Sequence, residues 1–384
     1  MYKTICLNIH KRHKILFISS WFPNKLEPTN GNFVQRHAEA VSLLHDVEVL
    51  HAIGDFNQKE KFVFDDQIIN GIRTLIVYYK NSKNPLQNFL RRMRAYQLGF
   101  KKMQKPHLVH GNVLHNNMLF AVSLKRKYGI PFVISEHWSV FQEQNHRKIS
   151  KSARFLAKKI AEKASFILPV TENLISGFQK LGINTPMKVV GNVVDTELFS
   201  PKFEKSEKFT FLHISNLISL KNPEKIIKTA IHLRQINQNF ELQIGGDGDL
   251  KPLQKMIHLN NAESYIKTFG MLNLEQVSEK MNDANCFVLF SDYENQPCVI
   301  LESLASGIPV IATKVGGISE LLDEKRGVLI EKKDGQELLE AMKNILEKNV
   351  VLESSENLRK YVVENFSKSV IAEKFSEIYN QVLS

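Results

Sequence analysis

Long hydrophobic runs and cysteines are both scarce in this chain of 384 residues. No apolar run reaches the length of roughly 18 residues that a membrane-spanning helix needs. The basic start is followed only by the short run ILFI, which suits a strand better than a signal peptide. Cys6, Cys286 and Cys298 show neither a close pair nor a metal-ligand spacing, so we expect reduced thiols. The sequence predicts a cytoplasmic protein.

Several cofactor and metal motifs are also missing. The chain has no Walker A loop, no paired-histidine zinc helix and no cysteine cluster. Asp247 and Asp249 are spaced like metal-binding aspartates, but they follow a predicted strand and suit a glycine turn. Gly246 and Gly248 are not followed by a third glycine, because Lys251 stands at that position, so the dinucleotide fingerprint is incomplete. We expect neither a metal nor a cofactor.

The composition is that of a globular protein with two domains, because 43% of the residues are hydrophobic and 24% are charged. The charge is uneven: residues 1–200 have 29 Lys and Arg against 14 Asp and Glu, whereas residues 201–384 have 22 against 26. This asymmetry fits either an anionic partner of the first half or a solvated basic surface.

Two stretches concentrate the basic charge. Residues 88–105 and 147–163 both combine Arg and Lys with apolar residues, as an interfacial amphipathic helix would. We interpret the second as a helix that packs on a sheet, and the first as the better candidate for contact with an anionic membrane. Nucleic acid is disfavoured because no aromatic platform accompanies the charge.

Short apolar strands alternate with amphipathic helices along both halves, which predicts parallel βαβ units. The first series has strands at 14–20, 47–53, 107–113, 131–137 and 166–170, with helices at 33–44 and 148–164; the second has strands at 209–215, 240–246, 266–270, 286–290, 309–313 and 327–330. We predict an α/β fold of two Rossmann-like domains in tandem that face a cleft. Their predicted bounds are 1–200 and 201–366, followed by a helix at 367–384 whose apolar residues have helical spacing.

The segment SDYENQPCVILESLASGIPVIAT, residues 291–313, has two glutamates eight positions apart. Pro297 suits the first helical position, and Gly307 suits the helix end. The start of that helix is a favourable site for a phosphate. Glu302, a turn further on, is better placed to accept hydroxyls such as a ribose diol, and Glu294 can reach a second polyol beyond the phosphates. Alternatively, both glutamates are ordinary surface or helix residues.

The same segment, with its pattern E-x-x-P-x-V-I-L-E, resembles the signature of the retaining glycosyltransferases of family 4, also described as glycosyl transferases group 1. The resemblance extends over most of the chain: VVGNVVDTELFSP (189–201) resembles the segment between the family's domains, and LQIGGDGDL (242–250) resembles its glycine turn. It implies the GT-B fold, with an acceptor-side first domain, a nucleotide-sugar donor domain second, and a C-terminal helix that crosses back to the first domain.

The resemblance also implies the site. Glu294, His137 and Lys221 would be catalytic: Glu294 and His137 contact the donor sugar, and Lys221 neutralises the diphosphate. Asn216 stands where the family usually has an arginine, so this position can donate hydrogen bonds to the diphosphate but carries no charge. The full set of predicted donor-binding residues is Gly31, Asn216, Lys221, Gly246, Glu294, Asn295, Gln296, Cys298, Val299 and Glu302. His110 is a candidate for the acceptor side or a buried structural histidine.

We therefore expect a retaining, metal-independent glycosyltransferase of hexosyltransferase type. It would move a sugar from a nucleotide-diphosphate sugar, a co-substrate rather than a cofactor, to a glycan or lipid-linked glycan acceptor in bacterial surface polysaccharide biosynthesis. Peripheral contact with the inner face of the cytoplasmic membrane is part of this expectation. Two alternatives remain open: a non-hydrolysing nucleotide-sugar epimerase, and an inactive nucleotide-sugar-binding partner subunit, which the Asn216 departure favours and the two glutamates disfavour.

Overall fold

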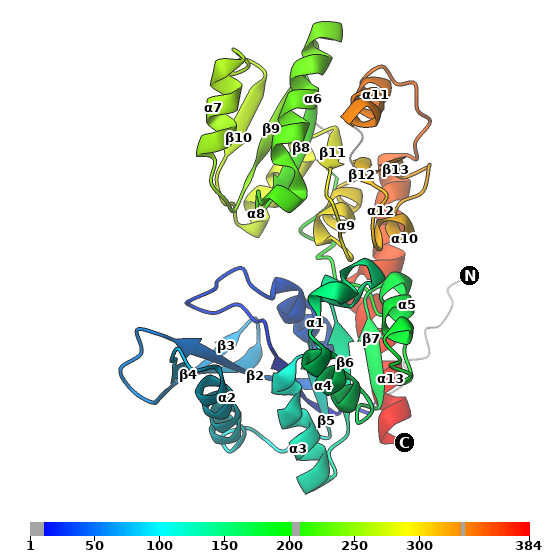
Figure 1. Cartoon of the computed structure of the whole chain (residues 1–384). Coiled ribbons are helices and arrows are strands. Elements are labelled where there is room, and N and C mark those ends of the chain that lie inside the picture. Colours follow the sequence, from blue (N-terminus) through cyan, green and yellow to red (C-terminus); the bar gives the residue numbers. More distant parts are fainter. Residues whose placement is uncertain (1–10, 202–207, 332–334) are drawn as a thin grey trace, which may run out of the picture. The chain divides into compact units, whose positions relative to one another are not determined.

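The computed structural model describes residues 11–201, 208–331 and 335–384 (Figure 1). Cys6 lies outside these residues. The chain divides into two compact units. The first unit comprises the described residues of Met1–Val170, Leu174–Val193 and Lys368–Ser384, and the second comprises Thr171–Asn173 and the described residues of Val194–Ser367. Each unit contains its own sheet.

The sheet of the first unit has the strand order β3-β4-β2-β1-β5-β6-β7. Its strands are β1 (Lys14–Ser19), β2 (Asp46–Asp55), β3 (Phe62–Ile69), β4 (Ile72–Lys80), β5 (Leu108–Asn112), β6 (Phe132–Glu136) and β7 (Phe166–Pro169). All neighbours are parallel except β3 and β4, which pair antiparallel. Alternate residues of β1 enter two different cores, Leu16 one and Phe17 the other, so both faces of this strand are buried.

Helices cover the first sheet. They are α1 (Asn32–Ser42), α2 (Pro85–Phe100), α3 (Leu119–Tyr128), α4 (Lys151–Ala161), α5 (Glu172–Lys180) and α13 (Lys368–Leu383), with short 3-10 turns η1 (Asn116–Met118), η2 (Ser139–Phe141) and η3 (Glu143–Lys148). The C-terminal helix α13 contacts α1 and buries Ile371, Phe375 and Tyr379 in the core of the first unit. The prediction that this helix returns to the first domain is confirmed.

The sheet of the second unit is parallel, with the order β10-β9-β8-β11-β12-β13. Its strands are β8 (Phe209–Ser215), β9 (Phe240–Gly246), β10 (Ile266–Phe269), β11 (Cys286–Leu289), β12 (Val310–Thr313) and β13 (Gly327–Ile330). Its helical elements are η4 (Ser219–Lys221), α6 (Pro223–Ile236), α7 (Lys251–Leu259), α8 (Leu274–Asp283), α9 (Cys298–Ala305), α10 (Ile318–Leu321), α11 (Gly335–Leu346) and α12 (Ser355–Phe366). The predicted α/β class is confirmed.

The structure differs from the sequence analysis at three places. Strands β3 and β4 were not predicted, although the dipeptide Asn70–Gly71 between them is a strong hairpin signal and both residues have positive φ. The long basic helix predicted from residue 148 is two elements, because the chain forms η3 first and α4 begins at Lys151, with Ser150 as its N-cap. Pro297 is the N-cap of α9 rather than its first helical residue.

Candidate functional site

The central contact of the second unit is an ion pair between Lys221 Nζ and Glu294 Oε1. Lys221 ends η4, and Glu294 lies in the loop between β11 and α9, so both stand beyond the carboxyl ends of strands. The two side chains are 18% and 10% exposed, which leaves each charge partly desolvated. An ion pair in this position is stronger than one on an open surface, because less water screens it.

Two residues that were not predicted hold the η4 loop against the β11–α9 loop. Asn222 Nδ2 donates to the carbonyl of Phe290 at 3.0 Å and to Asp292 Oδ1 at 3.3 Å. The amide of Asp292 donates in turn to the carbonyl of Leu220 at 2.8 Å. These bonds fix the backbone on either side of Lys221. The backbone of Asn222 is in the left-handed conformation, and Asn222 is the N-cap of α6, directly before Pro223. A proline at the start of a helix is the only sequence signal that could have pointed to Asn222.

A buried histidine supports the end of β8. His213 Nδ1 lies 2.8 Å from the carbonyl of Val288, and its Nε2 lies 2.9 Å from the hydroxyl of Ser215. The Ser215 hydroxyl also accepts the amide of Leu217 at 3.1 Å. Burial, with a smaller contribution from the nearby charge of Lys221, lowers the pKa of His213 to about 4, so the ring is neutral at pH 7. This neutral bridge joins β8 and β11 to the loop that leads to η4.

The glycine turn after β9 packs against the same loop. Gly246 has φ +132°, and a Cβ there would lie 1.9 Å from the carbonyl oxygen of Ser215. A Cβ on Gly248 would lie 2.7 Å from the carbonyl oxygen of Asn216. The turn therefore needs glycine for close backbone contact. Asn216 itself is exposed, next to this turn.

The start of α9 presents the remaining predicted residues. Glu302 lies in α9 and is 4% exposed, and Gly307 follows the helix with φ +71°, as predicted for the helix end. Asn295 and Gln296 precede the helix and are 9% and 8% exposed. Cys298 and Val299, which form the first turn, are partly exposed. The structure thus brings the second-unit residues of the prediction to one edge of one sheet.

In the first unit, Gly31 lies where the chain enters α1. It has φ +79°, and a Cβ there would lie 2.4 Å from the carbonyl carbon of Trp21. Its carbonyl accepts the amide of Val34 at 2.9 Å, which begins the helix. Glycine is therefore required here twice, by the left-handed backbone and by the contact with the β1–α1 loop.

The two predicted histidines of the first unit differ in environment. His137 follows β6 and is partly exposed, with its ring 4.2 Å from that of Phe33 and 5.2 Å from that of His37, centroid to centroid. Both ring nitrogens of His137 are nevertheless buried, and this burial lowers its pKa well below 6.5, so it is neutral at pH 7. His110 is fully buried, and its ring nitrogens contact the Tyr379 hydroxyl at 2.6 Å and the Ser135 hydroxyl at 2.7 Å. His110 is a structural residue and does not line an acceptor surface.

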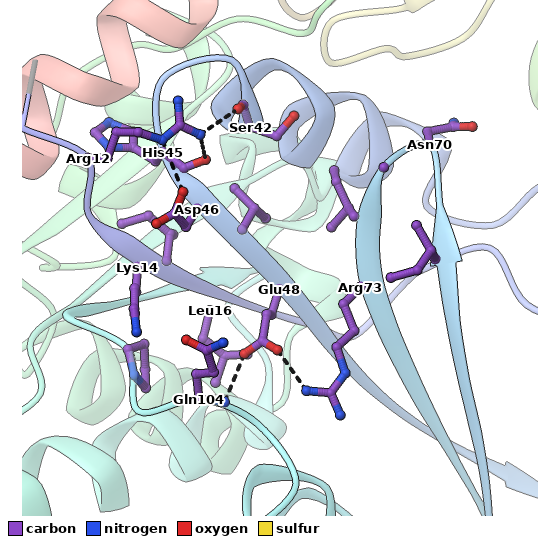
Figure 2. A pocket seen from close by; sticks show the side chains of 16 residues that line it. Arg12, Lys14, Leu16, Ser42, His45, Asp46, Glu48, Asn70, Arg73 and Gln104 are labelled. Atoms are coloured by element: carbon purple, nitrogen blue, oxygen red, sulfur yellow. Dashed lines mark hydrogen bonds and ion pairs between the residues drawn. The ribbon is translucent and has the colours of Figure 1, made fainter.

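A charged hollow of about 480 Å³ lies at the opposite edge of the first sheet (Figure 2). Arg12 bonds to Asp46 at 3.0 Å, and Arg73 bonds to Glu48 at 2.9 Å, so opposite charges meet within the hollow. It lies at the amino ends of β1, β2 and β4, whereas ligands of open α/β sheets sit beyond the carboxyl ends. We assign no ligand to it.

The described part of the chain contains neither a cluster of metal ligands nor a membrane-spanning helix. No group of three or more His, Cys, Asp or Glu within residues 11–201, 208–331 and 335–384 could hold a metal ion. Over the same described ranges, no helix has the length and apolar content needed to cross a membrane.

Comparison with known proteins gives matches over both units. Residues 194–365 match the family model described as Glycosyl transferases group 1, and residues 31–198 match the model described as Glycosyltransferase Family 4. TuaC of Bacillus subtilis (strain 168), provisionally named as a teichuronic acid biosynthesis glycosyltransferase, is 25% identical over 86% of this chain and 88% of its own. A UDP-Gal:alpha-D-GlcNAc-diphosphoundecaprenol alpha-1,3-galactosyltransferase of Escherichia coli is 24% identical over 72% and 76%.

Solved structures share the fold over nearly the whole chain. Sucrose-phosphate synthase of Thermosynechococcus elongatus has a TM-score of 0.77 at 18% identity, covering 97% of this chain and 99% of its own. HepE of Anabaena in complex with UDP has a TM-score of 0.75 at 18% identity, covering 96% and 100%.

Proposed function

The chain belongs to the group 1 glycosyltransferases, which have the GT-B fold, and from this premise we propose the reaction that it catalyses. It moves a sugar from a nucleotide-diphosphate sugar to a glycan or lipid-linked glycan of a bacterial surface polysaccharide. The anomeric configuration is retained, and no metal is required. The epimerase and the inactive partner subunit are not favoured by the glycosyltransferase matches.

The observation that carries this proposal is the contact between Lys221 and Glu294. A nucleotide-diphosphate sugar presents an anionic diphosphate beside a polyol, so it offers a new partner to each member of the pair. Lys221 would turn to the phosphates, and the released Glu294 carboxylate would accept sugar hydroxyls. In the absence of donor, the two charges neutralise one another.

The other residues fit the rest of the donor. The N-terminus of α9 offers the positive end of a helix dipole to the phosphates, and Glu302 within that helix would accept the ribose diol. Asn216 would contribute a neutral hydrogen bond where the family usually has a cationic arginine. Gly31 would let the backbone of the first unit approach the donor, and His137, being neutral, would contact the donor sugar without adding charge.

In the reaction, the bond between the anomeric carbon and the phosphate oxygen breaks through an oxocarbenium-like state. The acceptor hydroxyl forms the new bond on the same face, and its proton passes to the departing phosphate oxygen. Lys221 and the start of α9 stabilise the charge that grows on that phosphate, so the reaction needs no separate strong base.

Contact with an anionic membrane is part of the proposal, and α2 supports it. Leu86 and Leu90 lie one turn apart on α2 and are 67% and 58% exposed. Arg91 and Arg94 lie on the same helix. Exposed leucines beside arginines are typical of a helix that lies at a membrane interface.

The test is a panel of UDP-, GDP- and ADP-sugars, with thermal stabilisation and release of nucleoside diphosphate as the two readouts. One donor should stabilise the wild type, by about 2.7 kcal/mol at a hundredfold excess over Kd. Glu294→Ala should lose turnover and the stabilisation that depends on the sugar, but keep or gain affinity for nucleoside diphosphate, because Lys221 is then released. The exposed Glu279→Ala is the control. The proposal fails if no donor stabilises the wild type, or if nucleotide-sugar is converted without release of diphosphate when acceptors are supplied.

A further inference from the structure

Two hollows in the first unit share a wall. One encloses about 320 Å³ and the other about 430 Å³, and both are lined by His115 and Trp138. They lie where the chain leaves β5 and β6, which is the carboxyl edge of the sheet. Neither hollow contains any of the predicted donor-binding residues.

The smaller hollow has the surface of a sugar site. Trp21 and Trp138 meet edge to face, with ring centroids 5.8 Å apart. Glu27, Arg92 and Asn117 line the same hollow and provide a carboxylate, a guanidinium and an amide. Aromatic faces suit the C–H face of a pyranose ring, and the polar groups suit its hydroxyls. We call it the aromatic hollow.

The larger hollow is lined mainly by apolar side chains, together with the polar residues Asn116, Ser150 and Ser152. Val140, Phe141, Ile149, Leu156 and Ile160 line it, and they come from η2, the turn after η3 and α4. Carboxylates do not line it. We call it the apolar groove. Its lining suits a hydrocarbon chain and offers little to a second sugar.

The junction between the hollows is held rigidly and suits a phosphate. Glu136 is fully buried and accepts the amides of Leu114 at 2.6 Å and Trp138 at 2.7 Å, which fixes the two loops that form the shared wall. His115 offers ring nitrogens at this wall, and the exposed Lys148 also lines the groove. Lys151 and Arg154 follow on α4, so the surroundings of the groove are cationic.

We propose that the apolar groove holds the hydrocarbon chain of a lipid-linked acceptor, whose sugar occupies the aromatic hollow and whose linking phosphates lie between His115 and Lys148. The order of the sites, sugar then anion then hydrocarbon, is the order of groups in a sugar joined through a diphosphate to a lipid. This inference rests on the proposed function, because it chooses the lipid-linked acceptor over a free glycan.

The two tryptophans make the test direct. The sequence has only Trp21 and Trp138, and both line the aromatic hollow, so intrinsic fluorescence reports on it. The protein is titrated with farnesyl diphosphate and with dimethylallyl diphosphate, which have the same anion and differ by ten carbons. Burial of about 0.8 kcal/mol per methylene predicts that the farnesyl compound binds at least tenfold more tightly.

Ala153→Phe fills the groove from an exposed position of α4, so it should not disturb the core. It should weaken farnesyl binding at least tenfold and leave dimethylallyl binding and the unfolding temperature unchanged. Leu43→Gln removes an exposed leucine elsewhere in the first unit and should change neither affinity.

Equal affinities for the two diphosphates, or an Ala153→Phe variant that binds farnesyl diphosphate like the wild type, would overturn the groove assignment. The donor titration runs in parallel and involves the second unit. If a nucleotide-sugar stabilises the protein while farnesyl binding is absent, the groove assignment fails and the proposed transferase stands. If farnesyl binding is selective while no donor stabilises the protein, the proposed transferase fails instead.

Discussion

A position can require glycine because its φ is positive or because a Cβ would clash with a neighbour, and Gly31 and Gly71 differ in the second respect. Both have φ +79°, but a Cβ on Gly31 would lie 2.4 Å from the backbone of Trp21, whereas a Cβ on Gly71 would meet no atom within 4 Å. Gly71→Ala should therefore cost only the left-handed strain, about 1–2 kcal/mol. Gly31→Ala should cost more, because the β1–α1 loop must also move. Urea or thermal unfolding of both variants measures the difference, and equal losses would contradict it.

Buried histidines predict how stability depends on pH. Burial lowers the pKa of His37, His51 and His213 from 6.5 to about 4. Between these values the unfolded chain binds more protons than the folded chain, so the free energy of unfolding falls as the pH falls from about 6.5 to 4. Each residue contributes on the order of 3 kcal/mol over that window.

His213→Gln should make this pH dependence shallower by about one proton, because the glutamine does not titrate. His258→Gln is the control, since His258 is an exposed partner of Glu263. Unfolding temperatures measured from pH 8 to pH 4 give the slopes of the three proteins. If His213→Gln and the wild type have parallel curves, the buried histidine is not a source of the acid sensitivity.

The partners of the site residues were harder to predict than the residues themselves. Glu294 and Lys221 could be named from motifs, but their ion pair joins positions 73 apart in the chain. Such a pair depends on which strands become neighbours, here β8 and β11. The local spacing of residues does not show which strands become neighbours. Neither the ion pair nor the hydrogen bonds of Asn222 beside it could therefore be predicted from the sequence pattern.

At the scale of elements, α13 contributes apolar side chains to the core of the first unit and also the hydroxyl of Tyr379, which hydrogen-bonds His110 Nδ1. Tyr379→Phe removes this hydroxyl and leaves the buried Nδ1 without its hydrogen-bond partner. The cost should be about 1–3 kcal/mol, the penalty for an unsatisfied buried polar group. Tyr128→Phe, on the exposed face of α3, should be near neutral. Chemical unfolding compares them, and equal stability of both variants would show that the His110 bond contributes nothing.

The alternation of strands and helices was enough to predict the six strands of the second sheet and five of the seven in the first, because buried parallel strands are nearly continuous apolar runs. It missed β4, although that strand is also apolar and buried. It was not enough for β3 either, whose residues are all exposed or partly buried. Asp65, Asp66 and Gln67 divide this edge strand into two short apolar stretches, which do not stand out as a strand. The Asn70–Gly71 turn was the available signal.

At the scale of the molecule, the first unit is assembled from distant parts of the chain. Its sheet is complete by β7, yet its core also contains Ile371, Ala372, Phe375 and Ile378 of α13. These residues follow the whole second unit in the sequence. The family resemblance predicted this return, while the spacing of apolar residues in the helix predicted only an amphipathic helix.

This arrangement affects how the protein is made. During translation nearly all of the second unit, Val194–Ser367, emerges as one continuous segment and can fold on its own. The first unit is synthesised earlier, but its core is incomplete until residues 371–379 leave the ribosome. Until then one apolar face is uncovered and His110 lacks the Tyr379 hydroxyl. Its nascent form is therefore the aggregation-prone one, and we expect it to be the part that engages chaperones in the cell.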